Sequence, residues 1–198
     1  MVSADYDPGG GGVPANAAAV KILVSGGFGV GKTTLVGSIS EVPPLRTEEV
    51  MTSASACVDD LEGIEEKVTT TVALDFGRIT VNDDLVLYLF GTPGQERFWS
   101  MWNDLAVGAL GAVVLVDSRR LGTSFGSIDF FERRGIPFVV GINNFHGRME
   151  YTEDEIREAL SLNPRVPSMV CDVRRRDSCR DLLLTFVEHM MAEAGAPG

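Results

Sequence analysis

Apolar residues gather in short runs along this chain. The runs "VKILVS", "GAVVLV" and "IPFVVGI" are apolar without alternation and rich in β-branched residues, which is typical of strands buried on both faces. Two further runs, "VALDFGRIT" and "LVLYLF", flank the segment "VNDD", whose Asn and Asp residues favour a hairpin turn. The short run "PSMVC" predicts a last strand. We therefore expect strands at 20–25, 72–80, 85–90, 111–116, 136–142 and 167–171.

Amphipathic stretches between these runs predict helices. Phe98, Trp102 and Leu105 fall on one face of such a stretch. Thr152 and Glu155 have the spacing of a capping box, which opens a helix. We expect helices at 32–40, 95–107, 123–134, 152–161 and 177–193. The alternation predicts an α/β fold with a mainly parallel sheet covered on both faces, to which the hairpin adds one antiparallel edge strand.

The chain length of 198 residues suits one domain with short tails. Residues 1–18 are rich in glycine and lack an apolar pattern, so we expect a disordered N-terminal tail, a domain at 19–194 and a C-terminal tail at 195–198. The segment 41–70 is polar and weakly patterned. A structureless connection of that length is uncommon unless it is functional.

The formal net charge of −11 argues against binding to nucleic acids, because their phosphates attract basic proteins. The N-terminus lacks the pattern of a signal peptide, and no apolar run approaches 18 residues, so we expect a cytoplasmic protein without direct membrane insertion. Cys57, Cys171 and Cys179 form no CxxC pair, and we expect buried reduced thiols.

The stretch "GGFGVGKT" fits the pattern of a phosphate loop between a predicted strand and a predicted helix. Glycines let backbone N–H groups converge on phosphate oxygens, and the helix N-terminus adds a positive dipole. Lys32 would reach the terminal phosphates, and the Thr33 hydroxyl would bind the accompanying Mg²⁺. The residues expected at the phosphates are Gly26, Phe28, Gly29, Val30, Gly31, Lys32, Thr33 and Thr34.

Three other segments carry a resemblance to a known family. "LYLFGTPGQERF" resembles switch II of Ras-like small GTPases, "TTTVALDF" resembles switch I, and "FVVGINNF" lies where the guanine-binding motif follows a strand. The amino-acid sequences of these motifs look most like those of the bacterial small GTPases of actinobacterial conservon operons, which are relatives of the bacterial cell-polarity GTPases. The resemblance implies a P-loop fold with six strands, GTP/GDP and Mg²⁺ as ligands, and roadblock-type and sensor-kinase-like membrane proteins as partners. Contact with a membrane would then be made through partners.

The resemblance also implies roles for single residues. Lys32 and Thr33 hold phosphates and metal, and Thr71 is the switch I threonine, a second metal ligand that senses the terminal phosphate. Gly94 meets that phosphate through its backbone N–H, and Gln95 orients the attacking water. Thr69 and Thr70 compete with Thr71 for its assignment, and all three are also ordinary strand residues.

The base site follows from the segment after the strand at 136–142. Asn143 matches the first residue of the guanine motif, although an asparagine after a strand is also a common turn former. Asn144 and His146 follow in the motif. His146 stands where the family has an aspartate with two acceptors for guanine, and a neutral histidine offers one acceptor, which puts guanine preference in doubt.

Two further departures concern hydrolysis. Gly91 replaces the aspartate that usually begins switch II and supports Mg²⁺, and Asp75 is a candidate substitute that the sequence alone does not place. Phe28 replaces a small residue, and its ring is expected to crowd the terminal phosphate and any arginine supplied by a partner. Arg46 is a candidate arginine finger within the same chain, or a solvated surface residue.

These features predict a GTP-binding switch that hydrolyses GTP slowly. Two alternatives remain, a nucleotide-binding scaffold that does not hydrolyse and a relative that binds ATP. Gln95 favours the switch and Gly91 favours the scaffold, whereas His146 leaves room for adenine.

Overall fold

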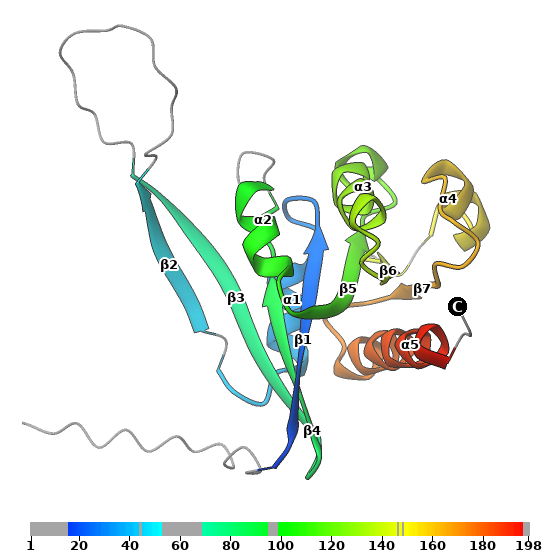
Figure 1. Cartoon of the computed structure of the whole chain (residues 1–198). Coiled ribbons are helices and arrows are strands. Elements are labelled where there is room, and N and C mark those ends of the chain that lie inside the picture. Colours follow the sequence, from blue (N-terminus) through cyan, green and yellow to red (C-terminus); the bar gives the residue numbers. More distant parts are fainter. Residues whose placement is uncertain are drawn as a thin grey trace, which may run out of the picture.

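The computed structural model describes residues 16–43, 45–52, 69–94, 99–145, 147 and 149–195, with backbone alone at 45–52, 69–73 and 99–100. One seven-stranded sheet runs through the domain in the order β2-β3-β4-β1-β5-β6-β7 (Figure 1). The strands are β1 (Ala18–Gly26), β2 (Leu45–Thr52), β3 (Thr69–Asn82), β4 (Leu85–Gly91), β5 (Ala109–Val116), β6 (Phe138–Asn143) and β7 (Ser168–Cys171). The helices are α1 (Lys32–Ile39), α2 (Trp99–Ala106), η2 (Leu121–Thr123), α3 (Phe125–Arg134), α4 (Glu153–Ala159) and α5 (Arg176–Gly195).

The α/β class and the mainly parallel sheet are confirmed. β1 pairs in parallel with β4 and β5, and β6 pairs in parallel with β5 and β7. β3 is antiparallel to β4, as the hairpin predicted, but it is not an edge strand because β2 pairs with it on the other side. β2 lies within the segment expected to be a weakly patterned connection, and it adds a strand to the six expected ones.

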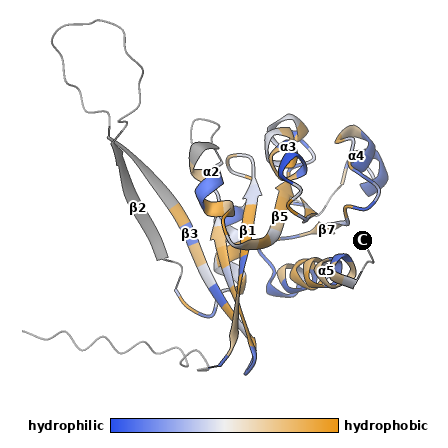
Figure 2. Cartoon of the chain, viewed as in Figure 1, coloured by the Kyte–Doolittle hydropathy of each residue, from blue (hydrophilic) through white to orange (hydrophobic). Residues whose placement is uncertain are grey.

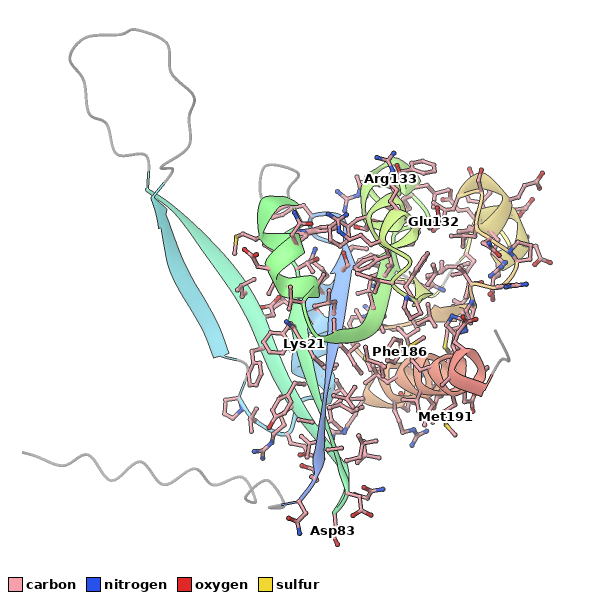
Figure 3. All side chains as sticks on the ribbon, viewed as in Figure 1. Lys21, Asp83, Glu132, Arg133, Phe186 and Met191 are labelled. Atoms are coloured by element: carbon pink, nitrogen blue, oxygen red, sulfur yellow. The ribbon has the colours of Figure 1, made fainter. Side chains whose placement is uncertain are left out.

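Helices cover both faces of the sheet, and the core has one apolar cluster on each face. Ile22 and Val24 of β1 face α1 and α5, whereas Leu23 faces the side of Trp102 and Phe131, as the alternation of side chains along a strand requires. Figure 2 shows the central strands as the apolar interior of the domain. Phe186 is fully buried beneath the sheet, and Met191, five positions later on α5, is exposed (Figure 3).

Several local predictions are confirmed. Thr152 and Glu155 form a complete capping box on α4. The predicted end of the helix at 123–134 is the end of α3, where Gly135 adopts the left-handed conformation with φ 61°. Cys171 and Cys179 are buried free thiols, whereas Cys57 lies outside the described residues. None of the helices that the structure describes is long and apolar enough to cross a membrane.

The fold places one end of β1 at a special position. From β1 the chain passes to strands on one side of the sheet, and it later returns to β5 on the other side. The carboxyl end of β1 is therefore a topological switch point, where open α/β sheets bind ligands. The stretch "GGFGVGKT" lies at this point, between β1 and α1. The predicted tail at 1–18 falls almost wholly outside the described residues, and the domain bounds of 19–194 stay a prediction.

Candidate functional site

The loop between β1 and α1 needs glycine at two positions for two reasons each. Gly26 and Gly31 have φ angles of 132° and 108°, a region that side chains disfavour. A Cβ at Gly26 would lie 2.3 Å from the Leu115 carbonyl oxygen, and one at Gly31 would lie 2.8 Å from Nδ2 of Asn143. The loop is thus packed against the ends of β5 and β6, and its backbone conformation depends on these glycines.

Lys32 is the first residue of α1, and its side chain is only 9% exposed. The ammonium group donates hydrogen bonds of 2.8 Å to the carbonyl oxygens of Gly26 and Gly27. Burial lowers the pKa of Lys32 to about 8, although the charge of Asp75 acts in the opposite direction. The loop therefore holds a desolvated positive charge that lacks a bonded anion in the described part of the chain.

A cavity of about 500 Å³ opens above this ammonium group. The N-terminus of α1 borders it, so the helix dipole and the loop both favour a negatively charged occupant. Its lining residues are Phe28, Gly29, Gly31, Lys32, Thr33, Thr34, Asp75, Thr92, Pro93 and Gly94.

Asp75 of β3 reaches the cavity and meets Thr33. The Thr33 hydroxyl donates a 2.6 Å hydrogen bond to Oδ2 of Asp75. A Cβ built at Gly91 would lie 3.0 Å from the Cβ of Asp75 and 3.2 Å from its Oδ2. The carboxylate of Asp75 therefore lies in the space next to Gly91, where an aspartate at the start of switch II would extend. The register of β3 and β4 fixes the position of Asp75, which could not be predicted from the sequence.

The segment after β4 lies directly over Lys32. A Cβ at Gly94 would be 2.6 Å from Nζ of Lys32 and 2.9 Å from the backbone N of Phe28, so only glycine fits there. Pro93 is fixed from the other side, because its carbonyl accepts a 3.1 Å hydrogen bond from the buried indole of Trp102. Gly94 thus occupies the approach to Lys32, while Gln95 lies outside the described residues.

Asn143 is buried at the end of β6 and connects three segments. Its Nδ2 donates to the carbonyl of Val30 at 2.9 Å, and its Oδ1 accepts from the backbone N–H of Val173 at 3.2 Å. These bonds join the phosphate loop to the segment after β7, which a solvent-exposed turn residue would not do. Asn144 donates its backbone N–H to the Cys171 carbonyl at 2.7 Å. His146 lies outside the described residues, so the base-binding roles stay predictions.

The loop after β5 contributes a charged cluster that sequence reasoning missed. The carboxylate of Asp117 is 1% exposed and accepts hydrogen bonds from Nε and Nη2 of Arg119, at 2.9 and 2.8 Å. These bonds hold the pKa of Asp117 below its usual value, against the effect of burial. Arg119 also lies 5.0 Å from the ring centroid of Phe145. The available signal was the polar sequence directly after a buried strand, at the sheet edge where parallel strands end.

For some of the other predicted site residues, the structure describes the backbone but not the side chain. The Phe28 side chain is 68% exposed at the mouth of the loop. Arg46 is paired with Asp75 in the β2–β3 register, and Thr71 is paired with Val50. Thr71 lies four positions before Asp75, about 13 Å along an extended strand. The side chains of Arg46 and Thr71 are outside the described ones, and their catalytic and metal-binding roles stay predictions.

Comparison with known proteins shows which family the chain belongs to. The family described as "Conserved hypothetical ATP binding protein" matches residues 24–193, which include the loop, Asp75, Gly94 and Asn143. The chain belongs to this family. A relative, the uncharacterized protein MJ1339 of Methanocaldococcus jannaschii, is 28% identical over 173 residues, covering 86% of this chain and 96% of its own.

Solved structures with the same fold include G-domains of the FeoB iron transporter. The cytosolic domain of the T. maritima FeoB iron transporter in a GDP form has a TM-score of 0.62 at 16% identity, covering 88% of this chain. This family member spans 64% of the length of that FeoB domain. The FeoB G-domain from Methanococcus jannaschii has a TM-score of 0.59 at 14% identity, covering 87% of this chain and 98% of its own. The chain therefore has the P-loop fold of small G-domains, as the resemblance to small GTPases implied.

The lowered pKa of Lys32 predicts proton uptake when a phosphate binds in alkaline solution. In the unliganded protein the pKa is about 8, so Lys32 is largely neutral above that pH. A bound phosphate favours the charged form and raises this pKa, so binding near pH 9 should add almost one proton. We expect nucleotide affinity to fall by up to about tenfold per pH unit above pH 8.

Isothermal titration calorimetry in two buffers of different ionisation enthalpy measures this proton uptake. A Lys32→Arg variant is the control, because its guanidinium stays charged across this range and should take up no proton. Binding by the wild type without proton uptake near pH 9 would show that Lys32 is already charged in the unliganded protein.

Proposed function

We propose that this protein is a guanine-nucleotide switch that hydrolyses GTP slowly. The observation that carries the proposal is the arrangement of Lys32, Thr33 and Asp75 around one cavity at the switch point of the sheet. A buried ammonium group and a helix N-terminus would bind the phosphates, and Thr33 and Asp75 supply oxygen donors beside them. The arrangement has the chemistry of a nucleoside di- or triphosphate site.

The donor set also fits Mg²⁺. Magnesium prefers carboxylate, hydroxyl and phosphate oxygens and keeps several of its waters. The Thr33 hydroxyl and the Asp75 carboxylate are 2.6 Å apart and face the phosphate cavity, so they would hold the ion there. When bound, Mg²⁺ would neutralise phosphate charge. Thr71 would join them only after the β2–β3 hairpin rearranges, because it lies further along β3.

Gly94 supplies a means of switching. It lies against Lys32 and the backbone of Phe28, so a terminal phosphate that reaches Lys32 would displace it or bond to its N–H. The neighbouring Pro93, whose carbonyl accepts a hydrogen bond from Trp102, would transmit this shift to α2. The proposed output is a change in the conformation of 41–71 and 91–107 with GTP, read by roadblock-type and sensor-kinase-like partners, as in conservon-type GTPases. Gln95 would orient the attacking water.

ATP is the second candidate ligand, because the family carries ATP binding in its description. Fluorescent GDP and ADP analogues, titrated with and without Mg²⁺, separate the two nucleotides. Phosphate release under single-turnover conditions separates a hydrolysing switch from a scaffold. Micromolar GDP binding with slow phosphate release supports the proposal. Preference for ADP, or GTP binding without any phosphate release, would replace it with one of the two alternatives.

We expect His146→Asp to increase the preference for guanine. A carboxylate would offer two acceptors to the guanine base where a neutral histidine offers one, which corresponds to a gain of about 1–3 kcal/mol over adenine. Competition of GTP and ATP for the fluorescent analogue measures the change. Asn82→Asp, at the turn between β3 and β4, controls for a general effect of negative charge. Equal selectivity in wild type and His146→Asp would mean that position 146 does not face the base.

A further inference from the structure

Arg120, in the loop between β5 and η2, contacts the phosphate loop directly. Its Nη2 donates a hydrogen bond of 3.3 Å to the carbonyl oxygen of Phe28. Its Nε lies 3.3 Å from Oδ2 of the buried Asp117. Arg120 is thus joined to a residue 92 positions away in sequence, and that residue, Phe28, lines the cavity.

The contact lies at the end of the loop that faces Gly94. The backbone N of Phe28 is 2.9 Å from a Cβ built at Gly94, and the carbonyl of Phe28 accepts from Arg120. Phe28 therefore lies between Arg120 on one side and Gly94, with Lys32 beneath it, on the other. Gly94 is the residue proposed to meet the terminal phosphate, so Phe28 lies between Arg120 and the proposed position of that phosphate.

Packing keeps the backbone of Arg120 at this place. A Cβ at Gly27 would lie 2.5 Å from Oγ1 of Thr123, so the loop after β5 rests on the phosphate loop without a gap. The Thr123 hydroxyl and N–H both bond to the carbonyl of Arg120, at 2.9 and 3.0 Å. The guanidinium is less constrained, because the Arg120 side chain is 50% exposed.

The neighbouring arginine serves a different purpose. Arg119 donates hydrogen bonds from Nε and Nη2 to Asp117 and lies over the ring of Phe145. Arg120 uses one longer contact to Asp117, and among the described residues its Nη2 bonds to a neutral carbonyl. A phosphate oxygen is a stronger acceptor than a carbonyl, because both partners are then charged.

We propose that Arg120 contacts the terminal phosphate of a bound nucleoside triphosphate and acts as an arginine finger within the same chain. The inference rests on the proposed function. During hydrolysis a water oxygen bonds to the γ-phosphorus, and the bond from phosphorus to the β–γ bridging oxygen breaks. That oxygen leaves with the electron pair, and the water proton ends on the released phosphate. Nη2 of Arg120 turns from the Phe28 carbonyl to the phosphate and stabilises its charge.

The test compares Arg120→Ala and Arg120→Lys with Arg133→Ala, an exposed arginine of α3 (Figure 3). We expect Arg120→Ala to keep GDP affinity within about twofold and to slow single-turnover GTP hydrolysis at least about tenfold. Arg120→Lys should recover part of the rate, and Arg133→Ala should match wild type. Millimolar guanidinium added to Arg120→Ala should raise its rate, which a structural role of Arg120 would not explain.

A second readout does not depend on a fast reaction. GDP with aluminium fluoride imitates the transferred phosphoryl group, and we expect wild type to trap it and Arg120→Ala to lose trapping at equal GDP binding. Unchanged hydrolysis and trapping in Arg120→Ala would overturn the inference and leave nucleotide binding in place. Wild type that binds GDP without hydrolysis or trapping would overturn it as well. Absence of any nucleotide binding by wild type is the separate result that removes the proposed function.

Discussion

Replacing Lys32 with alanine is expected to abolish nucleotide binding while the domain stays folded. The ammonium group is the buried positive charge at the phosphate cavity, and its loss removes a charged donor from the phosphate oxygens. Removing one member of a buried charge pair costs about 3–5 kcal/mol, which corresponds to at least about a hundredfold in affinity. Titration of a fluorescent GDP analogue measures the loss.

The unliganded fold should tolerate this change. The buried charge of Lys32 is itself unfavourable, as its lowered pKa shows, so its removal offsets the loss of the bonds to Gly26 and Gly27. Lys21→Ala is the matched control, since this lysine of β1 bonds to the Val107 carbonyl away from the cavity (Figure 3). A folded Lys32→Ala variant with wild-type affinity would rule out the assignment of the phosphate loop.

Replacing Asp75 with asparagine is expected to weaken Mg²⁺ binding by about 10–100-fold, the range seen when residues that support a metal are changed. Asparagine keeps the shape of the side chain and an acceptor for the Thr33 hydroxyl, so the change removes mainly charge. The rate of GDP release as a function of Mg²⁺ concentration measures the effect. Asp83→Asn, at the far tip of the same hairpin, should behave like wild type (Figure 3).

A swap of two positions tests whether Asp75 replaces the missing switch II aspartate. Gly91→Asp alone should fit poorly, because its Cβ would lie 3.0 Å from that of Asp75. Asp75→Gly combined with Gly91→Asp returns the carboxylate to the same space from the neighbouring strand and should recover Mg²⁺ dependence lost in Asp75→Gly. If Asp75→Asn releases GDP with the Mg²⁺ dependence of wild type, the carboxylate does not support the ion.

The sequence by itself determined most of the elements and the phosphate loop. The apolar runs became β1, β5 and β6, and the capping box of Thr152 and Glu155 opened α4, because these signals are local. The pattern from Gly26 to Thr33 was sufficient to predict the phosphate loop for the same reason, because the residues that form the loop come from one continuous segment. The class of fold followed from the alternation of strands and helices.

Only the tertiary structure decided which distant side chains share the site. β2 has no clear apolar alternation, and its strand state depends on backbone pairing with β3, a contact that local sequence does not encode. Asp75 reaches Thr33 through the β3–β4 register, Arg120 reaches Phe28 through packing of the loop after β5, and Asn143 joins three segments. Each contact depends on which strands are neighbours and where they end, and these are properties of the assembled sheet rather than of any single segment.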